Sequence, residues 1–172
     1  MLFCVLATVV AAAVALLCRF ADADVHRDDK LKILVVDDHP ITRKGVRLLL
    51  SQEADLEVCA EAESVDQAIR ALEHCRPDLA IVDLYLKGSS GLDLIKYLAA
   101  HHPTVLVLVL SMRDESFYAE RALEAGARAY ITKEDGTERL IEGIRKVLMG
   151  QVFVTDKIAA RLTRTYTSWL PL

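Results

Sequence analysis

The sequence has few of the residues that dominate loop-rich or cross-linked folds. Its 172 residues include only 7 glycines, 4 prolines, 4 cysteines and 1 tryptophan. Glycine and proline at this level exclude a collagen-like or low-complexity chain, and the cysteines are too few for a disulfide scaffold. The chain is therefore predicted to fold around a hydrophobic core, and its length suits a single domain.

An excess of positive charge is also missing. The 21 Lys and Arg residues against 25 Asp and Glu residues give a formal net charge of −4. A basic surface for nucleic acid or anionic membrane is therefore not indicated. No GxGxxG or GxxxxGK[ST] pattern follows the apolar run at residues 31–36, which argues against the common nucleotide-binding loops.

Cysteine patterns typical of metal sites are missing as well. Cys4 and Cys18 belong to an apolar leader, which leaves Cys59 and Cys75 in the rest of the chain. Neither belongs to a CxxC or Cys/His pattern, so a zinc site is not expected. We predict that both are small buried thiols in a reducing compartment.

The one long hydrophobic run stands at the start of the chain. Residues 2–18 carry no charge, and this length is at the lower limit for a membrane-spanning helix. Ala21-Asp22-Ala23 could be a signal-peptide cleavage site, but a basic segment before the run is missing. The first positive charge, Arg19, follows the run and would keep the remainder in the cytoplasm if the run inserted.

Three interpretations of residues 1–20 therefore stay open: a signal peptide, a membrane anchor with a cytoplasmic body, and a start assigned too far upstream. Residues 21–30 are rich in Asp and polar groups and are predicted to be a linker. We set both segments aside from the fold and expect a cytoplasmic location for the remainder.

From residue 31 onward, five short apolar runs alternate with amphipathic segments. The runs that predict strands are Leu31–Val36, Leu56–Ala60, Asp78–Asp83, Thr104–Leu110 and Arg128–Thr132. The apolar spacing between and after them predicts helices that begin near Pro40, Ser64, Leu92, Glu115 and Thr137. Ser64, with Gln67 three residues later, and Thr137 are predicted to cap their helices. Such alternation predicts a parallel sheet with helices on both faces, an α/β doubly wound fold.

Potentially reactive residues stand at the carboxyl ends of four of the five predicted strands. They are Asp37 and Asp38, then Asp83, Ser111 and Lys133. In a parallel sheet these ends lie at one edge, where ligands bind. Each residue has an ordinary alternative, such as a loop cap for Asp83, but their joint placement predicts a functional site.

This set of side chains suits phosphoryl chemistry. Crowded carboxylates repel one another and need a cation to remain ionised together. Oxygen ligands of this kind suit Mg²⁺. One aspartate could then attack a phosphoryl group, while the metal, a lysine and a hydroxyl share the phosphoryl oxygens.

The chain from about Leu31 to Leu162 resembles a bacterial response-regulator receiver domain. The motifs that carry the resemblance are Val35–Pro40, Asp78–Asp83, Leu110-Ser111 and Gly126–Lys133. The resemblance implies a flavodoxin-like (βα)5 sheet with strand order 2-1-3-4-5. It also implies that the receiver domain spans residues 31–150.

The same resemblance implies a role for each residue of the site. Asp83 would be the phosphoacceptor, and Mg²⁺ would be held by Asp37, Asp38, Asp83 and the backbone carbonyl of Tyr85. Ser111 would sense the phosphoryl group, Lys133 would pair with it, and Tyr130 would be the aromatic switch. On phosphorylation, Ser111 would move toward the phosphoryl group and Tyr130 would repack inward. Three flanking residues are expected to tune hydrolysis: Tyr85, Met112 and Arg113.

The end of the chain resembles the NarL/FixJ group of response regulators. Residues 122–127, 150–154 and 158–162 carry this likeness. In that group a helix-turn-helix domain follows, whereas residues 151–172 are interpreted here as a linker and helix without an output domain. Truncation, a divergent reading frame and a stand-alone receiver all remain open as reasons.

The expected partners are a sensor histidine kinase and a second copy of the chain after phosphorylation. DNA would be reached only through an output domain, and a membrane only through the leader. A receiver-shaped interaction module that does not use phosphate is the main alternative. An aspartate phosphatase needs a second aspartate where Tyr85 stands, so a dedicated enzyme is not expected.

Overall fold

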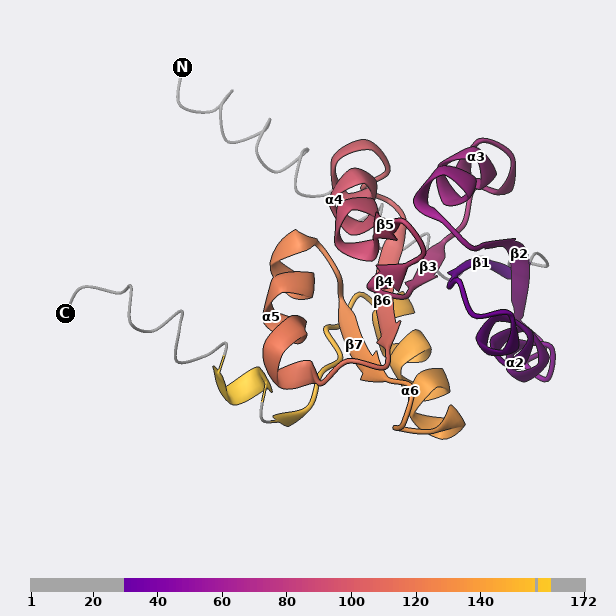
Figure 1. Ribbon diagram of the computed structural model, residues 1–172. Coiled ribbons are helices and arrows are strands. Elements are labelled where there is room, and N and C mark those ends of the chain that lie inside the picture. Colours follow the sequence, from indigo (N-terminus) through magenta and orange to yellow (C-terminus); the bar gives the residue numbers. More distant parts are fainter. Residues whose placement is uncertain (1–29, 157, 162–172) are drawn as a thin grey trace, which may run out of the picture.

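The structure is a computed structural model that describes residues 30–156 and 158–161. At its centre is a five-stranded parallel sheet in the order β2-β1-β3-β6-β7 (Figure 1). Its strands are β1 (Leu31–Val36), β2 (Leu56–Ala62), β3 (Leu79–Val82), β6 (Leu106–Ser111) and β7 (Ala129–Thr132). Counted along the sheet strands alone, this is the predicted order 2-1-3-4-5, and the α/β doubly wound class is confirmed.

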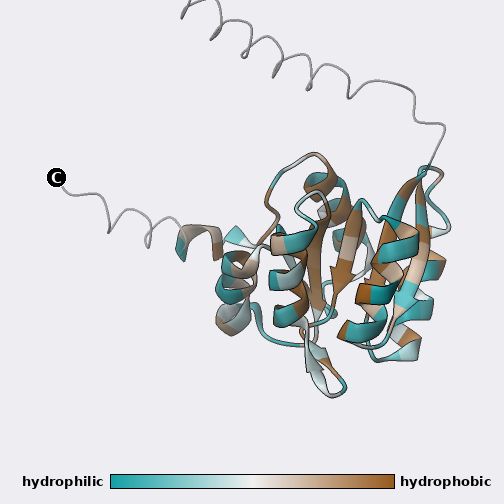
Figure 2. Cartoon of the chain, turned by 90° about the horizontal axis from the view of Figure 1, so that it is seen from above, coloured by the Kyte–Doolittle hydropathy of each residue, from teal (hydrophilic) through white to brown (hydrophobic). Residues whose placement is uncertain are grey.

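Five helices cover the two faces of the sheet. They are α2 (Pro40–Leu50), α3 (Val65–Cys75), α4 (Gly91–His101), α5 (Glu115–Ala125) and α6 (Thr137–Leu148). One core contains buried side chains of α3, α4 and α5, and the other contains those of α2 and α6. Figure 2 shows hydrophobic strands between helices whose hydrophilic residues lie toward the outside.

The helix starts follow the sequence signals with one correction. Ser64 caps α3, since its hydroxyl accepts a hydrogen bond from the Gln67 backbone N–H at 3.3 Å, as its spacing predicts. Thr137 was predicted to cap α6, but the cap residue is Gly136 and Thr137 is already helical. The φ of Gly136 is 85°, a left-handed value that suits glycine. The residue that caps α6 is therefore one position before the predicted cap, Thr137.

An irregularity in β2 determines which face each of its side chains covers. Ile33 of β1 pairs with Val58, but the next residue of β1 pairs with Ala60, so Cys59 is left out of the ladder. Val58 consequently packs in the core of α2 and α6, whereas Ala60 packs in the core of α3, α4 and α5. A bulge of one residue reverses the alternation in this way.

The prediction of two separate buried thiols is wrong. Cys59 and Cys75 form a disulfide that joins β2 to the last residue of α3, with a Cα–Cα distance of 5.8 Å. Both residues are half-buried. The pairing depends on contact between segments 16 residues apart in sequence, which the spacing of cysteines does not reveal.

Two additions lie outside the five-stranded sheet. The predicted loop after β3 contains a short antiparallel hairpin of β4 (Tyr85–Leu86) and β5 (Ser89–Ser90). After α6 the chain returns along β7, where Phe153 forms a bridge with Ala129. No helix within residues 30–156 and 158–161 is long and apolar enough to span a membrane; the leader lies outside the described residues.

Candidate functional site

The predicted polar residues meet at the carboxyl edge of the sheet. Asp37 follows β1, Asp83 follows β3, Ser111 is the last residue of β6, and Lys133 follows β7. Asp37 and Asp83 are only 2% and 3% exposed, and Ser111 is buried. The Lys133 Nζ lies 2.6 Å from Asp37 Oδ2 and 2.7 Å from Asp83 Oδ2. Four strands thus place an amine, a hydroxyl and two carboxylates in direct contact.

Both carboxylate oxygens of Asp83 accept hydrogen bonds. Its Oδ1 accepts hydrogen bonds from the Ser111 hydroxyl at 2.9 Å and the Tyr85 backbone N–H at 3.3 Å. Its Oδ2 accepts a hydrogen bond from the Lys133 ammonium group. The carboxylate is therefore fixed in orientation at the rim of the sheet, which is a requirement for directed attack on a bound group.

Burial and ion pairing shift the pKa of Lys133 in opposite directions. Desolvation lowers the pKa of its ammonium group, but hydrogen bonds to Asp37 and Asp83 outweigh it and raise the pKa above the usual value. The lysine is therefore charged at neutral pH. Its charge partly compensates the two buried carboxylates, which would otherwise repel each other.

The acid residues form a group suited to a cation. One ligand atom from each of Asp37, Asp38, His39 and Asp83 can be chosen so that all lie within 4.8 Å of one another. The Oδ1 of Asp38 is shielded from solvent and accepts no hydrogen bond within the described residues, although His39 Nδ1 lies 2.8 Å away. A carboxylate oxygen that is shielded from solvent and lies beside two further aspartates is a fitting ligand for a hard cation such as Mg²⁺.

The three residues expected to tune hydrolysis follow Asp83 and Ser111 closely in sequence. Tyr85 turns its side chain toward α5, where its hydroxyl donates a hydrogen bond to Tyr118 at 2.9 Å. This hydrogen bond raises the pKa of Tyr85. The Arg113 guanidinium lies 4.3 Å from the centroid of the Tyr85 ring, and Met112 is exposed beside it.

The two residues expected to act as a switch, Ser111 and Tyr130, both point inward. Tyr130 is 1% exposed, and its hydroxyl donates a hydrogen bond to the Arg113 backbone carbonyl at 3.0 Å. Burial raises the pKa of this phenol well above its usual range. Ser111 contacts Asp83 in the same structure. The inward positions that Tyr130 and Ser111 are expected to take on phosphorylation therefore fit within the packed core.

Sequence reasoning missed one residue of the site, Gly91. A Cβ on Gly91 would overlap the carbonyl oxygen of Asp83 and lie 2.8 Å from the Cα of Leu84. The Gly91 N–H also donates a hydrogen bond to the Leu84 carbonyl at 2.9 Å. The sequence shows only the glycine-rich character of residues 88–91, which indicates a loop rather than a contact with Asp83.

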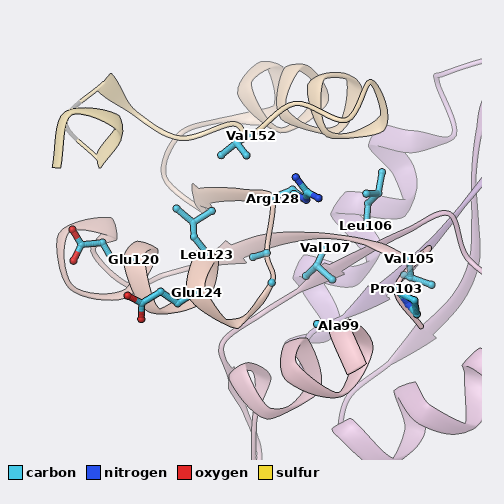
Figure 3. A pocket seen from close by; sticks show the side chains of 12 residues that line it. Ala99, Pro103, Val105, Leu106, Val107, Glu120, Leu123, Glu124, Arg128 and Val152 are labelled. Atoms are coloured by element: carbon cyan, nitrogen blue, oxygen red, sulfur yellow. The ribbon is translucent and has the colours of Figure 1, made fainter. Parts of the chain in front are cut away.

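A separate pocket lies at the other edge of the sheet, among α4, α5 and the beginnings of β6 and β7 (Figure 3). Its lining includes Ala99, Val107, Leu123 and Arg128. None of the strand-end residues of the site lines it. The candidate site is therefore the carboxylate group and its lysine, not this pocket.

Comparison with known proteins identifies the family. The family model of the response regulator receiver domain matches residues 33–145. The chain belongs to this family, a class of regulatory signalling domains. The predicted resemblance to receivers of the NarL/FixJ group is confirmed.

Curated relatives and solved structures agree with this assignment. The transcriptional regulatory protein DegU of Brevibacillus brevis is 32% identical over 139 residues, covering 81% of this chain and 59% of that protein. A nitrate/nitrite response regulator protein homolog of Haemophilus influenzae is 35% identical over 130 residues, covering 76% and 62%. The chain thus spans about three fifths of the length of these relatives.

Among solved structures, a two-component response regulator of the LuxR family from Aurantimonas sp. is 30% identical. The match covers 81% of this chain and 99% of that one, with a TM-score of 0.72. The non-phosphorylated receiver domain of RcsB from Escherichia coli is 25% identical, covering 74% and 100%, with a TM-score of 0.68. Both matches agree with the receiver fold described above.

Proposed function

We propose that this protein is a phosphoacceptor switch of a two-component system and that Asp83 is the residue that becomes phosphorylated. The observation that carries the proposal is the pair of contacts to Asp83, from Ser111 on one oxygen and from Lys133 on the other. A sensor histidine kinase is the proposed donor. The role is regulatory, with at most slow self-dephosphorylation.

The side chains that take part in the proposed transfer are already in contact with one another. A carboxylate oxygen of Asp83 forms a bond to phosphorus while the bond from phosphorus to the donor breaks. Lys133 Nζ and the Ser111 hydroxyl, which now contact the carboxylate, each turn to an oxygen of the transferred group. Because both already lie within 3 Å of Asp83, little rearrangement is required.

Asp37, Asp38 and Asp83 are the residues that would hold Mg²⁺, together with the backbone carbonyl of Tyr85. The chemistry supplied by a bound Mg²⁺ is neutralisation of charge at the phosphoryl oxygens and the carboxylates. The shielded Oδ1 of Asp38 supports this assignment. Lys133, which bridges Asp37 and Asp83 in this structure, would share the compensation of charge with the ion.

The proposed output is a change in partner affinity on the face formed by α5, β7 and α6. Tyr130 connects this face to the site because its hydroxyl binds the carbonyl of Arg113, two residues after Ser111. We propose homodimerisation as one consequence and control of transcription as another. Any contact with DNA would require an output domain. The proposed location is the cytoplasm, where a sensor kinase has its phosphoryl source.

A labelling experiment with the full chain tests the proposal. In Mg²⁺ and acetyl phosphate, the wild type is expected to gain one phosphoryl group by intact mass spectrometry, and Asp83→Asn none. Asp78→Asn is the matched control, because Asp78 precedes the same strand at its opposite end and accepts a hydrogen bond from the Lys32 N–H, as Asn also can. Equal labelling of wild type and Asp83→Asn would overturn the assignment. Absence of labelling in both would favour the phosphate-independent interaction module.

A further inference from the structure

The Cys59–Cys75 disulfide joins two elements that lie apart from the phosphorylation site. Cys59 is in β2, the edge strand of the sheet, and Cys75 is the last residue of α3. The residues that contact Asp83 are Ser111 of β6, Lys133 directly after β7 and Tyr85 of β4. A change at the cysteines can therefore occur without removing any group of that site.

The backbone conformation brings Cys59 and Cys75 close enough to form a disulfide. The ladder between β1 and β2 skips Cys59, which lies at the bulge of β2. Arg76, directly after Cys75, has a left-handed φ of 45° and caps the carboxyl end of α3. The resulting Cα–Cα distance of 5.8 Å lies in the range that disulfides need.

We propose that Cys59 and Cys75 form a reversible thiol–disulfide site, which exchanges with low-molecular-weight thiols and disulfides and locks α3 to β2. Both cysteines are half-buried, at the edge of the sheet, so a small reagent can reach them. The reversible character rests on the proposed function, because a receiver served by a sensor kinase works in a reducing compartment. Disulfides in that compartment are usually transient or redox-sensing.

The exchange balances with a low-molecular-weight disulfide as the oxidant. One cysteine thiolate attacks a sulfur of the reagent, which forms a mixed disulfide and releases one thiolate. The second cysteine thiolate then attacks the sulfur of the first cysteine, which forms the protein disulfide and releases the second thiolate. Two cysteine thiols lose their protons, the two released thiolates take them up, and the reagent is reduced by two electrons.

The closed form is expected to be the more stable one. The bond spans 16 residues of sequence, and closing a loop of this length restricts the unfolded chain. For a domain of this size, the expected rise in Tm is about 10 °C. Amide hydrogens near the end of α3 should also exchange more slowly in the oxidised protein, because the helix end is tied to the strand.

The test uses the full chain with Cys4→Ser and Cys18→Ser, so that only the two cysteines of interest remain. After oxidised glutathione, alkylation and mass spectrometry should find neither residue alkylated and no glutathione attached. Dithiothreitol should restore two alkylation sites. Two alkylated residues, or two glutathione adducts, in the oxidised sample would overturn the proposal.

Two further measurements keep the result interpretable. Cys59→Ser and Cys75→Ser should each show the same Tm with and without oxidant, and an equal oxidant effect in either variant would also overturn the proposal. Acetyl phosphate labelling of the oxidised and reduced forms is measured in parallel. Loss of labelling in both forms with normal thiol exchange counts against the phosphoacceptor role alone, so the two proposals fail separately.

Discussion

Gly91 shows how the site depends on the absence of a side chain. It stands at the first position of α4, and its Cα faces the backbone of Asp83 and Leu84 so closely that a Cβ would overlap it. The peptide between Asp83 and Leu84 is thereby held against the start of α4. Any substitution of Gly91 must displace either the helix or this peptide.

We expect Gly91→Ala to slow labelling of Asp83 by acetyl phosphate by about tenfold or more, because small misplacements of reacting groups are costly. The free energy of unfolding should fall by about 2 kcal/mol, since the core there has no room for a methyl group. Labelling rates from quenched mass spectrometry and urea unfolding measure the two effects.

Gly45→Ala is the matched control for this substitution. Gly45 lies inside α2, and a Cβ added there would have no neighbouring atom within 4 Å. Alanine should therefore stabilise the helix by up to about 1 kcal/mol without changing the labelling rate. If Gly91→Ala labelled as fast as Gly45→Ala, close packing behind Asp83 would be irrelevant to the reaction.

Lys133 is the second residue whose removal has a distinct consequence. It bridges Asp37 and Asp83, so Lys133→Met leaves two buried carboxylates without their cation. We expect a loss of about 2 kcal/mol in the free energy of unfolding without Mg²⁺. Millimolar Mg²⁺ should recover more stability in this variant than in the wild type, as measured by urea unfolding.

The control for Lys133→Met is Lys146→Met. Lys146 pairs with Glu142 one turn earlier on α6, and its Nζ lies 5.0 Å from the centroid of the Phe153 ring. Exposed pairs of this kind contribute little to stability, so the control should stay within about 0.5 kcal/mol of the wild type and show the wild-type response to Mg²⁺. An equal response to Mg²⁺ in all three proteins would contradict the role of Lys133 in compensating the acid group.

At the scale of elements, the segment after α6 completes the edge of the sheet. The Phe153 N–H donates to the Arg128 carbonyl at 2.8 Å, and its carbonyl accepts from the Tyr130 N–H at 3.1 Å. Ile158 is fully buried in the core of α3, α4 and α5. The Arg161 guanidinium pairs with Glu120 of α5 at 3.1 Å. The chain beyond α6 is thus integrated into the face that contains Tyr130 (Figure 1).

We therefore expect Ile158→Ala to lower the free energy of unfolding by about 2–4 kcal/mol, the usual effect of a cavity in a packed core. Val152→Ala is the control, because Val152 is exposed in the same segment, and it should change stability by less than about 0.5 kcal/mol. Equal effects of the two substitutions in urea unfolding would show that the segment contributes no core packing.

At the scale of the whole molecule, Arg145 joins distant parts of the chain. Its guanidinium on α6 binds Glu53 at 2.7 Å and also binds Asp55, both in the connection between α2 and β2. The hydrogen bond from Arg145 lowers the pKa of Asp55 and raises that of Arg145 itself. The two helices on one face of the sheet are linked through this cluster.

The lowered pKa of Asp55 determines the pH dependence of this contribution. Its stabilising effect is present above the unfolded-state pKa near 4 and is lost as the pH falls through the folded-state pKa. Arg145→Met should therefore reduce the free energy of unfolding by about 1 kcal/mol at pH 7, and by much less near pH 3. Urea unfolding at both pH values tests this, and a difference that grows toward low pH would contradict it.

The sequence by itself determined the alternation of strands and helices, the parallel sheet and the approach of Asp37, Asp83, Ser111 and Lys133. These features follow from local periodicity and from the rule that parallel strands end at one edge. Tertiary structure alone decided the contact behind Gly91, the Cys59–Cys75 bond and the return of the chain along β7. Each of these depends on how closely two segments approach in space. Local hydrophobic periodicity predicts the type of each element but not this approach.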